Sequence, residues 1–131
     1  MLIKQWEEFI AGSDSHGDQM DLDARKVFLK VVEDLKPKHR WHLGDIWDFR
    51  PFRKKADTEE KRESIRKDWD AGLSFLKEYA PTQITLGNHD ARLWLLAEER
   101  SGVLSDYAQD KVREIEAFWK LSKTEVKPPR S

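Results

Sequence analysis

Three short polar clusters in this 131-residue sequence carry side chains that could bind a cation and move a proton. Asp14 and His16 stand in "SDSHG", Asp45 and Asp48 stand in "GDIWD", and "GNHD" occupies residues 87–90. Carboxylate, imidazole and amide groups form an oxygen-rich ligand set that suits Mn, Fe, Zn or Co better than a soft ion such as Cu(I). If the fold brings these clusters together, they predict a divalent-metal centre.

Each cluster follows a short run of residues with the character of a strand. The three runs read "EFIAG", "HRWHL" and "TQITL", and each is followed directly by Ser-Asp, Gly-Asp or Gly-Asn. This combination is typical of a strand that passes into a loop. The sequence therefore predicts three strands, each with a polar cluster at its carboxyl end.

Helical patterns separate the strands. Apolar side chains recur at three- and four-residue steps from Ala24 to Leu35, with Asp21 placed to cap the start and Pro37 to end the run. A second helix is expected after the capping box "DTEE" at residues 57–60. Two further helices are expected in "ARLWLLAEER" and around "REIEAFWK". The order strand, helix, strand, helix, strand indicates an α/β fold with parallel strands.

Parallel strands joined by right-handed crossovers place all their carboxyl ends at one edge of the sheet. The three clusters should therefore converge there, which is where ligands bind in such sheets. Asp14 and Asp45 would then repel each other unless a cation lay between them. We expect a divalent metal ion, with Asp45 able to bridge two ions.

The three clusters resemble the D-x-H, G-D-x-x-D and G-N-H-[DE] motifs of the calcineurin-like metallophosphoesterases. The resemblance covers residues 9–94, and the motifs occur in the family's order at the expected strand ends. It implies a metallophosphoesterase-like βαβαβ half-sandwich with parallel strands and flanking helices. Only enough strands for one sheet can be counted, so the second sheet of that fold is expected to be missing or incomplete.

Carried over residue by residue, the resemblance implies a role for each polar side chain. Asp14 and His16 would bind one metal ion, Asp45 would bridge both, and Asn88 would bind the second. His89 would act as the acid that protonates the leaving oxygen. Two further roles complete the set: Asp90 would orient His89, and Asp48 would hold a ligand or the loop backbone.

The implied activity is hydrolysis of phosphodiesters or phosphomonoesters by a water that two metal ions activate. Nucleic acid or nucleotides are the preferred substrate class. Arg50 and Arg53 follow the middle motif and are candidates for steering a phosphate, although such charge runs are more often a solvated face. In the phosphoprotein phosphatase branch an Arg follows the second Asp of the middle motif. Phe49 stands there in this chain, which argues against protein phosphatase activity.

The family supplies further His ligands from a C-terminal half that this sequence does not show. All four histidines lie before residue 90, so the second metal site is expected to be incomplete. The chain would then be a fragment, a split half completed by another polypeptide, or a reduced form. The alternative function is a truncated or split non-catalytic half-domain that binds metal or a partner chain. An open apolar sheet face would also favour self-association.

The composition of the chain limits its possible partners, its chemistry and its location. Lys and Arg total 24 against 25 for Asp and Glu, so no bulk charge recruits nucleic acid or an anionic membrane. The absence of cysteine excludes disulfides and thiolate chemistry. No run of about 18 apolar residues occurs, so we expect a cytoplasmic protein with no membrane association. Residues 1–121 are expected to form the domain and residues 122–131 a linker or frayed tail.

Overall fold

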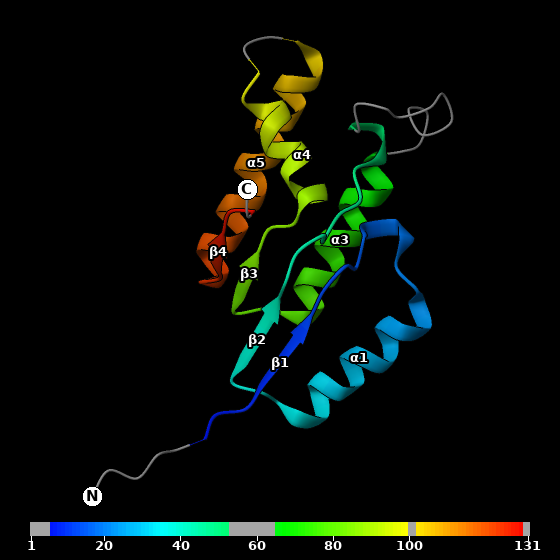
Figure 1. The fold of residues 1–131 in the computed structure, drawn as a ribbon, viewed down its shortest axis with the longest axis vertical. Coiled ribbons are helices and arrows are strands. Elements are labelled where there is room, and N and C mark those ends of the chain that lie inside the picture. The colour runs from blue at the N-terminus through cyan, green and yellow to red at the C-terminus, as the bar shows by residue number, and fades with distance from the viewer. Residues whose placement is uncertain (1–5, 53–64, 100–101, 130–131) are drawn as a thin grey trace, which may run out of the picture.

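In the part of the chain that the structure describes, four parallel strands form one sheet, in the same order as they occur in the sequence (Figure 1). They are β1 (Phe9–Gly12), β2 (His39–His42), β3 (Gln83–Thr85) and β4 (Glu125–Lys127). The register aligns Gly12 with His42, His42 with Ile84, and Ile84 with Val126. The computed structural model describes residues 6–52, 65–99 and 102–129. Over these ranges the predicted α/β class with parallel strands is confirmed.

Four α-helices occur in the described ranges: α1 (Leu22–Leu35), α3 (Ile65–Tyr79), α4 (Asn88–Ala97) and α5 (Val103–Ser122). Two single-turn 3₁₀ helices, η1 (Gly17–Gln19) and η2 (Arg50–Phe52), follow the first two polar clusters. The Asp21 carboxylate accepts the backbone N–H groups of Asp23 and Ala24 at 2.9 and 3.0 Å, so the predicted cap of α1 is confirmed. The capping box predicted at residues 57–60 lies outside the described residues.

The described helices pack on one face of the sheet. Sequential strand order with right-handed crossovers carries every connecting helix to the same side, and Figure 1 shows α3 crossing behind β1 and β2. Alternate strand residues point into two apolar clusters on that side: Ile10 meets α1 and α3, and Ile84 and Val126 meet α3, α4 and α5. This core fixes the strands whose carboxyl ends carry the polar clusters.

The opposite face of the sheet carries exposed apolar side chains. Phe9 and Trp41 stack there with ring centroids 4.8 Å apart, and Phe9 and Leu43 are both more than half exposed. Within the described ranges no second sheet covers this face. Self-association through it stays a prediction, which sedimentation at rising protein concentration tests. None of the described helices is long and apolar enough to cross a membrane.

One expectation about local structure needs correction, and one helix is less buried than its neighbours. Residues 125–127 form β4 beside β3, so this part of the predicted tail belongs to the sheet. The strand has only three residues, and its short pattern next to two prolines did not predict it. On α1 the apolar stripe is only half buried: Phe28 and Val32 face inward, whereas Val27 and Val31 are exposed. The amphipathic pattern thus predicted the helix, and only part of its apolar stripe is buried.

Candidate metal centre

The first two polar clusters lie side by side beyond the ends of β1 and β2. The backbone N–H of Asp14 donates to the carbonyl oxygen of Gly44 at 2.9 Å, and that of His16 donates to Asp45 at 2.9 Å. Gly17 continues the pairing, donating to Ile46 at 2.8 Å. The loops thus extend the parallel pairing of their strands, which brings the side chains at 14, 16 and 45 to one edge.

The third cluster forms the first turn of α4, which begins at Asn88 directly after Gly87. The backbone N–H of His89 donates to Asp45 Oδ1 at 2.9 Å, which joins this helix to the middle loop. A Cβ at residue 87 would lie 2.2 Å from Asp45 Oδ1, whereas the φ of −92° suits any residue. Glycine at residue 87 is therefore needed for this close approach, and its backbone conformation does not require it.

Left-handed backbone conformations concentrate in the two loops. Seven non-glycine residues in the described ranges have positive φ. Three of them, at 36, 80 and 123, directly follow helix ends, where this conformation is usual. The other four are Asp14, His16, Asp45 and Phe49. Backbone strain of this kind is held in place by surrounding contacts and gathers at functional sites.

Asp14, His16 and Asp45 form a ligand group that fits a divalent metal ion. One ligand atom from each lies within 4.8 Å of the other two, and His16 Nε2 lies 3.3 Å from Asp14 Oδ1. A hydrogen bond from the Ser13 hydroxyl and a second from His16 lower the pKa of Asp14, so this carboxylate is ionised at neutral pH. Two carboxylates and one imidazole at such spacing are the donor set expected for Mn, Zn or Fe.

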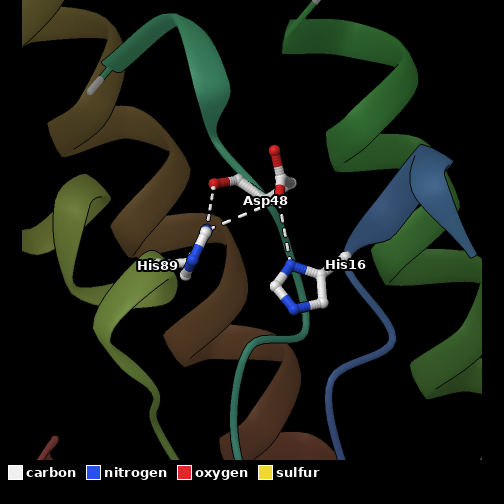
Figure 2. A group of neighbouring side chains, drawn as sticks. All are labelled: His16, Asp48 and His89. Atoms are coloured by element: carbon white, nitrogen blue, oxygen red, sulfur yellow. Dashed lines mark hydrogen bonds and ion pairs between the residues drawn. The ribbon is translucent and has the colours of Figure 1, made fainter. Parts of the chain in front are cut away.

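Asp48 lies between two histidine rings at the edge of this group (Figure 2). Its Oδ1 is 2.9 Å from His16 Nδ1 and 3.4 Å from His89 Nδ1, and its Oδ2 accepts from Arg50 at 2.9 Å. Burial alone would raise the pKa of Asp48, but the bonds from His16 and Arg50 outweigh it and lower the pKa. Burial likewise opposes the protonated form of His16, yet Asp48 and Asp14 together raise its pKa.

His89 faces the same carboxylate from α4. Its Nδ1 lies 3.1 Å from the backbone oxygen of Asp48, and its ring meets that of His16 edge-on at 4.8 Å. A carbonyl oxygen only accepts, so Nδ1 carries the proton and Nε2 remains for proton transfer. The expected placement of His89 beside the ligand group is therefore seen, with Asp48 as its neighbouring carboxylate.

Comparison with known proteins gave no match: no family model, no curated protein and no solved structure is significantly similar to this chain.

Asp90 has a different place from the one expected. It is fully buried, and its carboxylate accepts the backbone N–H groups of Asp45, Trp47 and Gly87 at 2.9, 3.0 and 3.0 Å. Burial raises its pKa to about 7, even though these three bonds favour the ionised form. The hydrogen bonds described for Asp90 go to the loop backbone and not to the His89 ring, so it orients the loops.

The other predicted residues are placed as follows. Asn88 is exposed in the first turn of α4, one residue before His89. Arg50 bridges two carboxylates, with Asp18 3.1 Å from its Nη2 and Asp48 2.9 Å from its Nη1, so part of its role is to hold Asp48. Arg53 lies outside the described residues.

Three side chains in the described residues contact the loops of the site but were not among its predicted members. Arg92 donates to the backbone oxygen of Asp48 at 2.9 Å, and Asp68 on α3 accepts from the loop backbone. His42, on β2, is buried: the Gly44 N–H donates to its Nδ1, and its Nε2 lies 3.0 Å from Ser15 Oγ. Asp68 and Arg92 occupy ordinary helical positions in the sequence, so no local pattern singled them out.

A cavity of about 390 Å³ opens beside the ligand group. Asp14 and His16 line it, and Met20, Phe28 and Phe75 contribute apolar side chains to its wall. The site thus combines a group that could hold a cation with an adjoining cavity.

Proposed function

We propose that this chain carries the metal-binding half of a metal-dependent phosphoesterase that hydrolyses phosphodiesters or phosphomonoesters. The observation that supports this most is the convergence of Asp14, His16 and Asp45 within 4.8 Å, beside His89. Two carboxylates this close to each other favour a bound cation. The motif resemblance to calcineurin-like metallophosphoesterases points to the same chemistry, with a half-sandwich of that fold as the proposed architecture.

Contacts support the proposed role of each side chain except Asn88, whose role rests on the motif resemblance. Asp14, His16 and Asp45 would hold the metal ion, and Asp48 fixes the His16 ring through Nδ1, which leaves Nε2 on the side of Asp14. Asn88, in the first turn of α4, supplies a neutral oxygen for a second ion that Asp45 would share. A bound pair of divalent ions would activate water and offset charge on the phosphoryl oxygens.

His89 holds the proton for the leaving oxygen. Its Nδ1 is anchored on the Asp48 backbone oxygen at 3.1 Å, which leaves Nε2 for the substrate. The cavity beside Asp14, with Phe28 on its wall, has room for the organic part of the ester. Nucleic acid and nucleotides are the substrate classes to test first.

Hydrolysis of bis(4-nitrophenyl) phosphate and 4-nitrophenyl phosphate with and without Mn²⁺ tests the proposal. We expect nitrophenolate release that requires Mn²⁺, stops with EDTA and falls about 100-fold or more in Asp45→Asn. Asp34→Asn is the matched control, because Asp34 is an exposed carboxylate on α1 paired with Lys30. Equal rates for Asp45→Asn and the wild-type chain would exclude the proposal.

A non-catalytic half-domain is the second candidate. The group Asp14, His16 and Asp45 provides ligands for one ion, whereas a second ion would have only Asp45 and Asn88 from the proposed set. This arrangement favours binding of a single metal without turnover. Calorimetry that finds one Mn²⁺ per chain, together with no hydrolysis of either ester, would support this function over the enzyme.

A further inference from the structure

Asp68 is a buried carboxylate on α3 that contacts the loop carrying Asp48. Its side chain is 2% exposed. Oδ1 accepts the backbone N–H of Asp48 at 3.1 Å, and Oδ2 accepts that of Phe49 at 2.6 Å. A carboxylate in the interior of a helix usually faces water, whereas this one accepts hydrogen bonds from the backbone of a loop that is distant in the sequence.

The loop at residues 45–49 is held by carboxylates from two helices. Asp90 on α4 accepts from Asp45 and Trp47, and Asp68 on α3 accepts from the next two residues. The loop begins and ends in left-handed conformation, with φ of 56° at Asp45 and 54° at Phe49. Such a conformation persists only where contacts enforce it, and these hydrogen bonds supply the enforcement.

Asp68 also touches the loop that carries His16. A Cβ at Gly17 would lie 1.7 Å from Asp68 Oδ1, so the carboxylate packs directly against that glycine. Gly17 in turn donates to the carbonyl oxygen of Ile46 at 2.8 Å. The Asp68 carboxylate therefore lies where the loops of His16 and Asp48 meet, and it fixes both relative to α3.

We propose that Asp68 is a positioning residue that sets the Asp48 carboxylate against His16 Nδ1. The chain of contacts runs from the Asp68 carboxylate to the Asp48 backbone, and from the Asp48 side chain to the His16 ring at 2.9 Å. The consequence for metal affinity rests on the proposed function, whereas the effect on the His16 ring does not.

The test compares Asp68→Asn with Asp70→Asn, a control at an exposed carboxylate on the same helix. The asparagine keeps one acceptor oxygen and turns an NH₂ group toward a backbone N–H, so one loop hydrogen bond is lost. In metal-free protein we expect the ¹⁵N shift of His16 Nδ1 to move in Asp68→Asn and to stay at the wild-type value in Asp70→Asn. With metal, calorimetry should show about ten-fold weaker Mn²⁺ binding in Asp68→Asn alone.

The outcomes separate the two proposals. A wild-type chain that binds no Mn²⁺ counts against the proposed function, and the His16 shift then still decides the role of Asp68. A folded Asp68→Asn protein with an unchanged His16 shift overturns the positioning role. If Asp68→Asn does not fold, amide hydrogen exchange in the wild-type chain tests the positioning role of Asp68 instead. The Asp48 and Phe49 amides must exchange as slowly as core amides, and exchange at the rate of open loops overturns the proposal.

Discussion

His16 and Asp48 are joined by a 2.9 Å contact between Nδ1 and Oδ1, although 32 residues separate them in the sequence. An ionised carboxylate only accepts hydrogen bonds, so the proton of this contact belongs to His16 Nδ1. This leaves Nε2 on the side of Asp14, 3.3 Å away, as the nitrogen that can bind a metal. A carboxylate that holds the far nitrogen of a ligand histidine is a common means of fixing its orientation and basicity.

Asp48→Asn should weaken Mn²⁺ binding about 10- to 100-fold without unfolding the chain. The amide oxygen can still accept the hydrogen bond from His16 Nδ1. The substitution removes the negative charge that raises the pKa of His16 and pairs with Arg50. Isothermal titration with Mn²⁺ measures the change, and Asp34→Asn on α1 serves as the control. Unchanged affinity in Asp48→Asn would show that the contact is irrelevant to the metal.

Gly87→Ala should damage the site by steric conflict. The new Cβ would lie 2.2 Å from Asp45 Oδ1 and 2.5 Å from its backbone nitrogen, so the middle loop must shift. We expect a loss of about 1–3 kcal/mol in stability and at least about ten-fold in Mn²⁺ affinity.

Gly102→Ala is the matched control, because residue 102 precedes α5, has a φ of +120° and has open space around its Cβ position. Alanine there strains the backbone and lowers stability, but it leaves Asp14, His16 and Asp45 in place. If both variants lose stability and only Gly87→Ala loses Mn²⁺ affinity, the steric account holds. Equal Mn²⁺ affinity in the two variants would contradict it.

The sequence predicted the members of the candidate site better than their contacts. Asp14, His16 and Asp45 were found because each directly follows a strand-like run, and parallel topology then brings strand ends together. The roles of Asp90 and Asp68 could not be predicted, because a buried carboxylate that accepts backbone N–H groups looks like any helical carboxylate in sequence. Only the three-dimensional path of the loop shows which donors need acceptors.

Local sequence patterns also predicted only part of the fold. The α1 helix was predictable from its period and from Asp21, since both signals act within a few residues. Strand β4 was missed because three residues carry too little pattern, and its pairing with β3 depends on α4 and α5 returning the chain to the sheet. Trp47, between Asp45 and Asp48 in the middle motif, is buried and stacked on Trp69 at 4.8 Å.

His89→Asn should slow hydrolysis most for esters with poor leaving groups. A general acid contributes about 10²- to 10⁴-fold when the leaving oxygen needs a proton, and nitrophenolate needs one least. We expect a small loss of kcat on 4-nitrophenyl phosphate, a much larger loss on phenyl phosphate, and unchanged Mn²⁺ affinity. Equal losses on both esters would argue that His89 is not the acid.

The pH dependence of stability should report on His42. Burial lowers the pKa of this histidine to about 4 in the folded chain, against about 6.5 when unfolded. Above about pH 6.5 both states hold His42 neutral and it adds no pH dependence. As the pH falls from about 6.5 to 4, only the unfolded state takes up the proton, so the free energy of unfolding should drop by about 3 kcal/mol.

His42→Gln should remove this contribution, because glutamine does not titrate. Urea unfolding of the wild-type and His42→Gln chains at several pH values between about 4 and 7 gives the difference in their slopes. Asp90, whose pKa of about 7 makes stability fall as the pH rises from about 4 to 7, is present in both chains and cancels in that difference. The control His39→Gln, at a partly exposed position on the same strand, keeps the His42 contribution. Parallel curves for the wild-type and His42→Gln chains would mean that His42 is protonated as readily in the fold as outside it.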